Sequence, residues 1–253
     1  ASAGDHIVTS PRLYGGTETL FEVTLPRLGI EFTFVDNPDD PASWEAAVKP
    51  NTKAFYGETF GNPIADILDI PAIADVAHAN RVPLIVDNTM ATAALVKPLE
   101  LGADIVVVST TKFYTGNGSA LGGAIIDGGS FDWTVQRDGA DVFPYFTNPD
   151  PAYHGLVYAD VGAPAYAVKA RAGVLRDTGA AISPFNAWLA LQGMDTLGLR
   201  VEKHNANALE VAQFLDANPQ VATVNFAGLP SSPHYTTKEK LGLKYTGSVL
   251  SLS

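Results

Sequence analysis

Lys112 stands directly after a run of apolar residues, in a segment rich in hydroxyl and glycine residues. The segment reads Ser-Thr-Thr-Lys-Phe-Tyr-Thr-Gly-Asn-Gly over residues 109–118, after the apolar run 104–109. An amine at the edge of a buried sheet can lose solvation, which lowers its pKa and makes it a usable nucleophile. The neighbouring hydroxyl and backbone N–H groups can bind a phosphate. The alternative is an ordinary surface lysine in a polar turn.

Asp87 ends a second apolar run, residues 83–87. A carboxylate that leaves a buried strand needs a partner, because burying an unpaired charge is costly. That partner is a ligand cation or, in the plainer interpretation, a neighbouring arginine or the backbone of the next turn. An acid and a lysine at successive strand ends are what pyridoxal 5′-phosphate (PLP) requires, for its ring nitrogen and its Schiff base. The pair Asp87 and Lys112 therefore predicts a PLP site.

Two loops near strand ends offer further groups for such a site. Tyr14 precedes Gly15 and Gly16, and glycines let the backbone approach a flat ring on which the tyrosine can stack. A tyrosine packed in an ordinary turn is the alternative. Asn62 precedes Pro63 and offers an amide donor, although a plain turn also explains this pair.

The five histidines show no spacing typical of a metal site, so we expect no bound metal. His78 and His204 lie in predicted helices, where ordinary surface or interhelix positions explain them. His154 lies in a long loop, from which it could line a site.

The composition excludes several classes of protein. The 253 residues include 16 Lys and Arg and 27 Asp and Glu, and this net charge of −11 argues against a nucleic-acid surface. The absence of cysteine excludes disulfides, thiolate metal ligands and a cysteine nucleophile. No apolar run approaches the roughly 20 residues of a membrane helix, and the first residues do not form a signal peptide. We expect a cytoplasmic protein that binds neither nucleic acid nor membrane.

Apolar runs alternate with amphipathic stretches in the first half of the chain. Strands are predicted at 5–9, 30–35, 53–56, 83–87, 104–109 and 121–126, and a helix at 71–80. Continuous Val and Ile runs separated by helices are typical of an α/β fold with a mainly parallel sheet sandwiched by helices. Ligands bind at the carboxyl ends of such strands, where Asp87 and Ser109 are expected.

The second half of the chain has a different character. Residues 129–166 show no clear period and predict a long loop that is functional or mobile. Residues 183–215 predict one long helix or two abutting helices, and 221–226 and 247–252 predict strands of a smaller α+β domain. The predicted division is a large cofactor-binding domain (1–182), a long connecting helix (183–217) and the start of a small C-terminal domain (218–253).

The ordered set of motifs resembles the Cys/Met-metabolism family of PLP-dependent enzymes over nearly the whole chain. The motifs are Gly4-Asp5-His6-Ile7-Val8, Leu13-Tyr14-Gly15-Gly16-Thr17, Glu58-Thr59 with Asn62-Pro63, Val86-Asp87-Asn88-Thr89, Ser109-Thr110-Thr111-Lys112, Gly122-Gly123, Ser183-Pro184-Phe185-Asn186 and Leu199-Arg200. Segments 147–155 and 179–186 are most similar to the O-acetylhomoserine sulfhydrylase branch. The resemblance implies the aspartate-aminotransferase-like fold, fold type I of the PLP enzymes.

The resemblance also implies roles for the residues around the cofactor ring. Lys112 would carry the Schiff base and then move protons at the substrate Cα and Cβ, so its pKa should lie near neutral. Asp87 would pair with the ring nitrogen. Tyr14 would stack on the ring and assist proton transfer, and Asn62 would hydrogen-bond the phenolic oxygen.

Ser109 and Thr111 would bind the phosphate of the cofactor. The implied reaction is γ-replacement, in which O-acetyl-L-homoserine and sulfide give L-homocysteine and acetate for methionine biosynthesis. The alternatives are cystathionine γ-synthase, γ-lyase or O-succinylhomoserine sulfhydrylase activity, or a silent fragment that acts only in association. The family's first phosphate-site elements and its substrate-carboxylate arginine fall outside the chain. We therefore expect a piece, truncated at both ends, of a homotetramer built from dimers.

Overall fold

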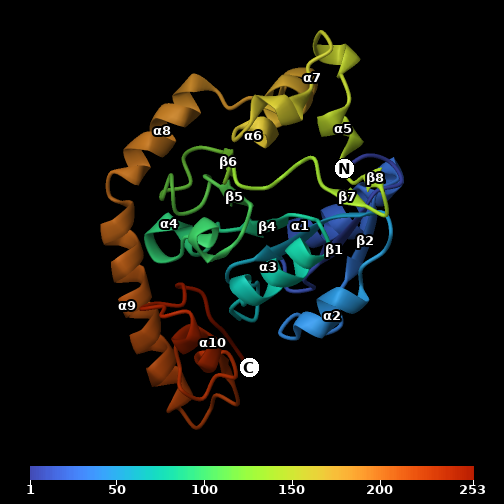
Figure 1. Cartoon of the computed structure of the whole chain (residues 1–253). Coiled ribbons are helices and arrows are strands. Elements are labelled where there is room, and N and C mark those ends of the chain that lie inside the picture. Colours follow the sequence, from blue (N-terminus) through green and yellow to red (C-terminus); the bar gives the residue numbers. More distant parts are fainter.

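A six-stranded sheet lies at the centre of the protein, for which a computed structural model describes residues 1–253 (Figure 1). Its strands are β1 (His6–Thr9), β2 (Glu31–Phe34), β3 (Thr52–Glu58), β4 (Leu84–Asp87), β5 (Ile105–Ser109) and β6 (Gly123–Asp127). Their order is β2-β1-β3-β4-β5-β6; the first five run parallel, and β6 pairs antiparallel with β5. The predicted mainly parallel α/β sheet is confirmed.

Strand β3 is longer than the predicted segment 53–56. It pairs with β1 on one side and β4 on the other, and two partners satisfy its backbone over seven residues. In the register with β4, Glu58 lies opposite Asp87. The parallel pairing therefore brings two carboxyl side chains to neighbouring strand ends.

Helices surround this sheet. They are α1 (Gly15–Thr19), α2 (Pro41–Ala46), α3 (Ile70–Ala79), α4 (Thr92–Leu95), α5 (Pro144–Thr147), α6 (Ala165–Lys169), α7 (Arg176–Thr178), α8 (Pro184–Met194), α9 (Leu197–Asp216) and α10 (Tyr235–Lys240). The helix predicted at 71–80 is confirmed as α3, whose first turn is capped by the Asp69 side chain accepting from the Ala72 N–H. Its buried face includes Ile73 and Ala77, in the main core.

The segment predicted at 183–215 forms two abutting helices, α8 and α9. The Ser183 hydroxyl accepts from the Asn186 N–H at 3.1 Å, as expected of an N-cap, and Pro184 opens the first turn. Asp195 and Thr196 separate the two helices. Together they run along one side of the molecule, from the α6–α7 region to the C-terminal segment (Figure 1).

Residues 129–166 are more structured than predicted. They contain the short antiparallel pair β7 (Gln136–Arg137) and β8 (Ala140–Asp141), helix α5 and two short 3₁₀ helices. Their aromatic side chains form part of the core, and Trp133 stacks on Phe146 with ring centroids 4.2 Å apart. Helix α6, a π-helical segment (Ala170–Leu175) and α7 follow, and sequence analysis missed them. Short turns that pack through aromatic rings leave no regular period in the sequence.

The predicted C-terminal strands are shorter than expected. Strands β9 (Val224–Asn225) and β10 (Ser251–Leu252) are two residues long each and form an antiparallel pair. Neither of them contacts a third strand. Helix α10 between them was not predicted. The division into domains at 182/183 and 217/218 stays a prediction. None of the helices is both long and apolar enough to cross a membrane.

Candidate active site

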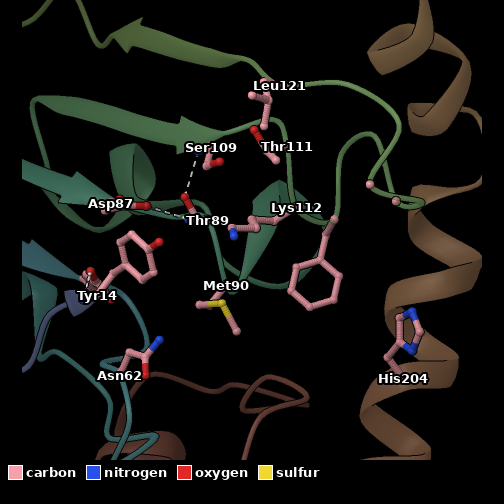
Figure 2. Close-up of a pocket in the computed structure, with 14 residues that line it drawn as sticks. Tyr14, Asn62, Asp87, Thr89, Met90, Ser109, Thr111, Lys112, Leu121 and His204 are labelled. Carbon is pink, nitrogen blue, oxygen red and sulfur yellow. Dashed lines mark hydrogen bonds between the residues drawn. The ribbon is translucent and has the colours of Figure 1, made fainter. Parts of the chain in front are cut away.

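A cavity of about 680 Å³ opens at the carboxyl ends of β3, β4 and β5 (Figure 2). Its lining includes every residue that the sequence predicted for the site: Tyr14, Asn62, Asp87, Ser109, Thr111 and Lys112. They come from four separate segments of the chain, which the parallel sheet brings to one edge. The cavity therefore unites the predicted set in space, and the role of each residue stays a proposal.

Both oxygens of Asp87 are oriented by neighbouring donors. The Thr89 N–H donates to Oδ1 at 2.9 Å, and the Tyr56 hydroxyl donates to Oδ2 at 3.3 Å. Burial, together with the charge of Asp87, raises the pKa of Tyr56 well above its usual value, so the phenol stays protonated as a donor. Asp87 thus presents a carboxylate of fixed orientation to the cavity.

Lys112 lies in the turn that follows β5. The Lys112 N–H donates to the Ser109 carbonyl at 3.4 Å, and its own carbonyl accepts from the Gly116 N–H at 2.8 Å. Its ammonium makes no ion pair and lies 5.6 Å from the centre of the Tyr14 ring. We expected the amine to be desolvated, but the side chain is exposed to the open cavity. The residues of this chain do not bury it.

Hydroxyl groups line the cavity beside this turn. The Thr111 hydroxyl accepts from the Gly122 N–H at 3.1 Å and donates to the Gly122 carbonyl at 3.2 Å. The Ser109 backbone N–H donates to the Thr89 hydroxyl at 2.8 Å, and the Ser109 side-chain hydroxyl itself has no hydrogen-bonding partner within the chain. The free Ser109 hydroxyl can donate to an anion.

Tyr14 and Asn62 approach the cavity from two loops. The Tyr14 ring is half-exposed, and the Lys112 side chain extends toward it (Figure 2). A side chain at Gly16 would meet this ring, because a Cβ there would stand 3.2 Å from its Cδ1 atom. Arg12, in the loop that carries Tyr14, donates to Asp66, in the loop that carries Asn62, at 2.6 Å, and so joins the two loops. Gly16 therefore permits the position of the Tyr14 ring, whereas the stacking predicted from the Gly-Gly turn stays a prediction.

Part of the cavity lining was not predicted from the sequence. Glu58 belongs to the Glu58-Thr59 motif but had no predicted role, and no sequence signal marked Met90 and Phe113. His204, predicted to be an ordinary helical residue, faces the cavity from α9 and contacts the Phe113 ring edge at a centroid distance of 5.9 Å. His154 does not line it. No sequence pattern reports which face of α9 turns to the sheet, because that depends on packing.

A mainly parallel α/β sheet that carries an acid and a lysine at adjacent strand ends defines the class of fold-type-I PLP enzymes. The model of the family described as Cys/Met metabolism PLP-dependent enzyme matches residues 1–253, and the chain belongs to this family.

Among its relatives, the O-acetyl-L-homoserine sulfhydrylase of Corynebacterium glutamicum is 72% identical over 99% of this chain and 57% of its own length. The O-acetyl-L-homoserine sulfhydrylase of Leptospira meyeri is 50% identical over 94% of this chain and 54% of its own length. The chain thus spans little more than half the length of these relatives.

Two solved structures share the fold at significant sequence identity. The O-acetylhomoserine sulfhydrylase of Wolinella succinogenes is 39% identical, with a TM-score of 0.84, over all of this chain and 67% of its own. A Campylobacter jejuni protein assigned as an O-acetylhomoserine (thiol)-lyase is 38% identical, with a TM-score of 0.92, over all of this chain and 62% of its own. The latter carries N'-pyridoxyl-lysine-5'-monophosphate.

Proposed function

We propose that this chain is part of a PLP-dependent O-acetylhomoserine sulfhydrylase, which converts O-acetyl-L-homoserine and sulfide into L-homocysteine and acetate. The observation that carries the proposal is the cavity in which Asp87 and Lys112, at adjacent strand ends, meet Tyr14 from a neighbouring loop. The 72% identity to the corynebacterial sulfhydrylase supports the choice of reaction within the family.

The chemistry of the donor set suits PLP. Asp87 offers an oriented carboxylate to the ring nitrogen, and Lys112 offers an amine free of any ion pair. Ser109 offers a hydroxyl donor to the phosphate, and Thr111 can offer its own by giving up its bond to the Gly122 carbonyl. The side-chain amide of Asn62 can donate to the phenolic oxygen. When bound, PLP supplies an electron sink that stabilises negative charge at the substrate Cα.

The residues of the chain then have separate tasks in γ-replacement. With PLP bound, Asp87 would hold a proton on the ring nitrogen, and Tyr14 would pack over the ring. The Lys112 Nζ would remove the proton from the substrate Cα and pass it to the bound cofactor, which frees the amine to remove a second proton from Cβ as acetate leaves Cγ. Hydrosulfide adds at Cγ, and Lys112 returns protons to Cβ and Cα as a general acid.

Borohydride trapping tests the cofactor assignment. Protein with its native termini, reconstituted with PLP and reduced, should carry the pyridoxyl group on Lys112, as peptide mass spectrometry would show. Lys112→Ala should lose both the visible absorbance band and the trapped adduct. Lys97→Ala serves as a control, because Lys97 is exposed and pairs only with Glu100. An adduct that persists in Lys112→Ala would refute the assignment.

Substrate competition tests the reaction. We expect kcat/KM for O-acetylhomoserine with sulfide to exceed that for O-succinylhomoserine and for cystathionine. A cystathionine γ-lyase of Lactobacillus plantarum shares the fold at 32% identity and a TM-score of 0.82, so preferred cleavage of cystathionine is the main competing outcome. No turnover of any of these substrates by a protein that holds PLP would favour a purely structural role.

We further propose that the protein acts as a cytoplasmic homotetramer. Helices α8 and α9 expose large apolar side chains, among them Phe185 (65% exposed), Trp188 (52%) and Leu199 (74%). Exposed apolar groups gathered on adjoining helices are typical of contact surfaces between subunits. Sedimentation equilibrium of the protein with its native termini tests the tetramer, and cell fractionation tests the compartment.

A further inference from the structure

Glu58 is a buried carboxyl to which the proposed reaction gives no task. It is the last residue of β3 and lies opposite Asp87 in the parallel register. Only 7% of the residue is exposed, and it lines the same cavity. Burying an ionised carboxylate is costly unless a cation or several donors compensate it.

Glu58 has a single hydrogen-bonding partner, the backbone of Tyr14. The Tyr14 N–H donates to its Oε1 at 2.7 Å and so joins positions 44 residues apart. Tyr14 flanks the start of α1, where no side chain caps the helix, and its carbonyl accepts from the Thr17 and Glu18 N–H groups. This hydrogen bond therefore fixes the backbone from which the phenol ring projects toward Lys112.

The charged groups around Glu58 do not compensate a negative charge. Asp87 faces it from β4 and Asp66 from the loop that follows β3, and both are acids. Arg12 is engaged by Asp66, at 2.6 Å, and by Asp39, at 2.9 Å. No salt bridge is formed by Glu58 itself.

Two further titratable groups face this region. The Tyr56 hydroxyl, on the same strand, donates to Asp87 and not to Glu58. Lys112 approaches from the turn after β5 and forms no ion pair. Burial above all, opposed by the hydrogen bond from Tyr14 and reinforced by Asp87 and Asp66, raises the pKa of Glu58 to about 8.

We propose that Glu58 is the positioning residue for Tyr14, and that it acts as a neutral, protonated carboxyl. One oxygen accepts the Tyr14 N–H, and the proton on the group keeps a second negative charge away from Asp87. Asp87 is then the single anion at these strand ends. This inference rests on the proposed function, which supplies the PLP ring that Tyr14 would face.

Two substitutions at Glu58 distinguish its role as a hydrogen-bond acceptor for Tyr14 from the effect of its charge. Glu58→Gln keeps an oxygen that can accept the Tyr14 N–H but cannot ionise, whereas Glu58→Leu fills a similar volume without an acceptor. In the protein with its native termini, we expect Glu58→Gln to bind PLP within about three-fold of the wild-type affinity, and Glu58→Leu to bind it about ten-fold more weakly or worse. Glu18→Gln is the matched control, since Glu18 is exposed in α1.

Kinetics distinguish positioning from a general loss of folding. With Glu58→Leu, kcat should fall while KM for the ester changes less, because a displaced Tyr14 affects the reacting complex more than substrate binding. With Glu58→Gln, both constants should stay near their wild-type values.

The pH dependence of urea unfolding provides a readout that needs no cofactor. The folded-state pKa of about 8 lies above the ordinary value of 4.5, so the folded protein binds more protons than the unfolded chain between these values. Wild-type stability should therefore fall, relative to Glu58→Gln, as the pH rises from 5 to about 8, and then level off. Glu18→Gln should follow the wild type throughout.

Three results would overturn the proposal. The first is a Glu58→Leu protein that binds PLP as tightly as the wild type, and the second is a Glu58→Gln protein that loses PLP as Glu58→Leu does. The third is an unfolding curve of Glu58→Gln that follows the wild type at every pH. If borohydride does not attach PLP to Lys112 in the wild type, the proposed function fails instead, and the unfolding experiment still decides the charge state of Glu58.

Discussion

Replacing Gly193 by alanine should displace the turn that carries Lys112. Gly193 lies one residue from the end of α8, and a Cβ there would stand 2.8 Å from the Thr115 carbonyl carbon and closer still to the Tyr114 and Thr115 carbonyl oxygens. Ordinary contact begins at 3.4 Å, so the helix or the turn must move by at least about 0.6 Å. The contacted atoms belong to the backbone and cannot rotate away.

Arg200 carries this movement toward Lys112. Its guanidinium donates to the Gly193 carbonyl at 2.6 Å and to the Phe113 carbonyl, next to Lys112, at 2.9 Å. We expect the strain to cost about 1–3 kcal/mol, as overpacking in a close-packed interior does. A misplacement approaching 1 Å at the reacting amine should lower kcat/KM by about ten- to a hundred-fold.

Gly198→Ala is the matched control for this prediction. Gly198 lies one residue inside α9 with nothing within 4 Å of its ideal Cβ, so alanine there should gain up to about 1 kcal/mol of helix propensity. Urea unfolding followed by circular dichroism should place Gly193→Ala below Gly198→Ala by about 1–4 kcal/mol. Equal stability and equal kcat/KM in the two variants would show that α8 does not hold the Lys112 turn.

Three further predictions follow from other parts of the structure. Asp87→Asn should lower kcat/KM by about a hundred-fold or more, because the ring nitrogen loses its anionic partner; near-normal turnover would refute that role. His6 is fully buried between the Thr33 and Thr52 hydroxyls, and burial above all lowers its pKa to about 4. Since the unfolded chain takes up that proton near pH 6.5, stability should fall from pH 6.5 to 4 in the wild type, and His6→Asn should not show this fall in urea titrations. Trp44→Ala should cost about 3–5 kcal/mol in the same assay, since Trp44 is wholly buried, whereas a loss below 1 kcal/mol would contradict its place in the core.

The sequence predicted those parts of the site that depend on local pattern. Asp87 ends one continuous apolar run and Lys112 follows another, and such runs, separated by amphipathic helices, are typical of buried parallel strands. Because parallel strands end at the same edge of a sheet, placing the acid and the lysine at successive strand ends already predicted that they meet. Tyr14 was placed through the Gly-Gly turn, whose second glycine makes room for the ring.

Other contacts depended on how distant segments pack. The aromatic residues of 129–166 looked like a loop because their burial comes from short turns without a period, and α6, α7 and α10 were missed. His204 was predicted to be an ordinary helical residue, although it lines the cavity. Only the packing of α9 decides which face of that helix meets the cavity.

Sequence alone determined the fold class, the family and six of the side chains around the cavity, because these can be recognised from hydrophobic periodicity and from the order of motifs along the chain. The tertiary structure alone decided how those side chains are held. Glu58 meets Tyr14 across 44 residues, and Arg200 meets the carbonyl of Phe113 across 87. Hydrogen bonds over such separations, and the raised pKa of a carboxyl buried beside Asp87, exist only once the sheet has brought the strand ends together.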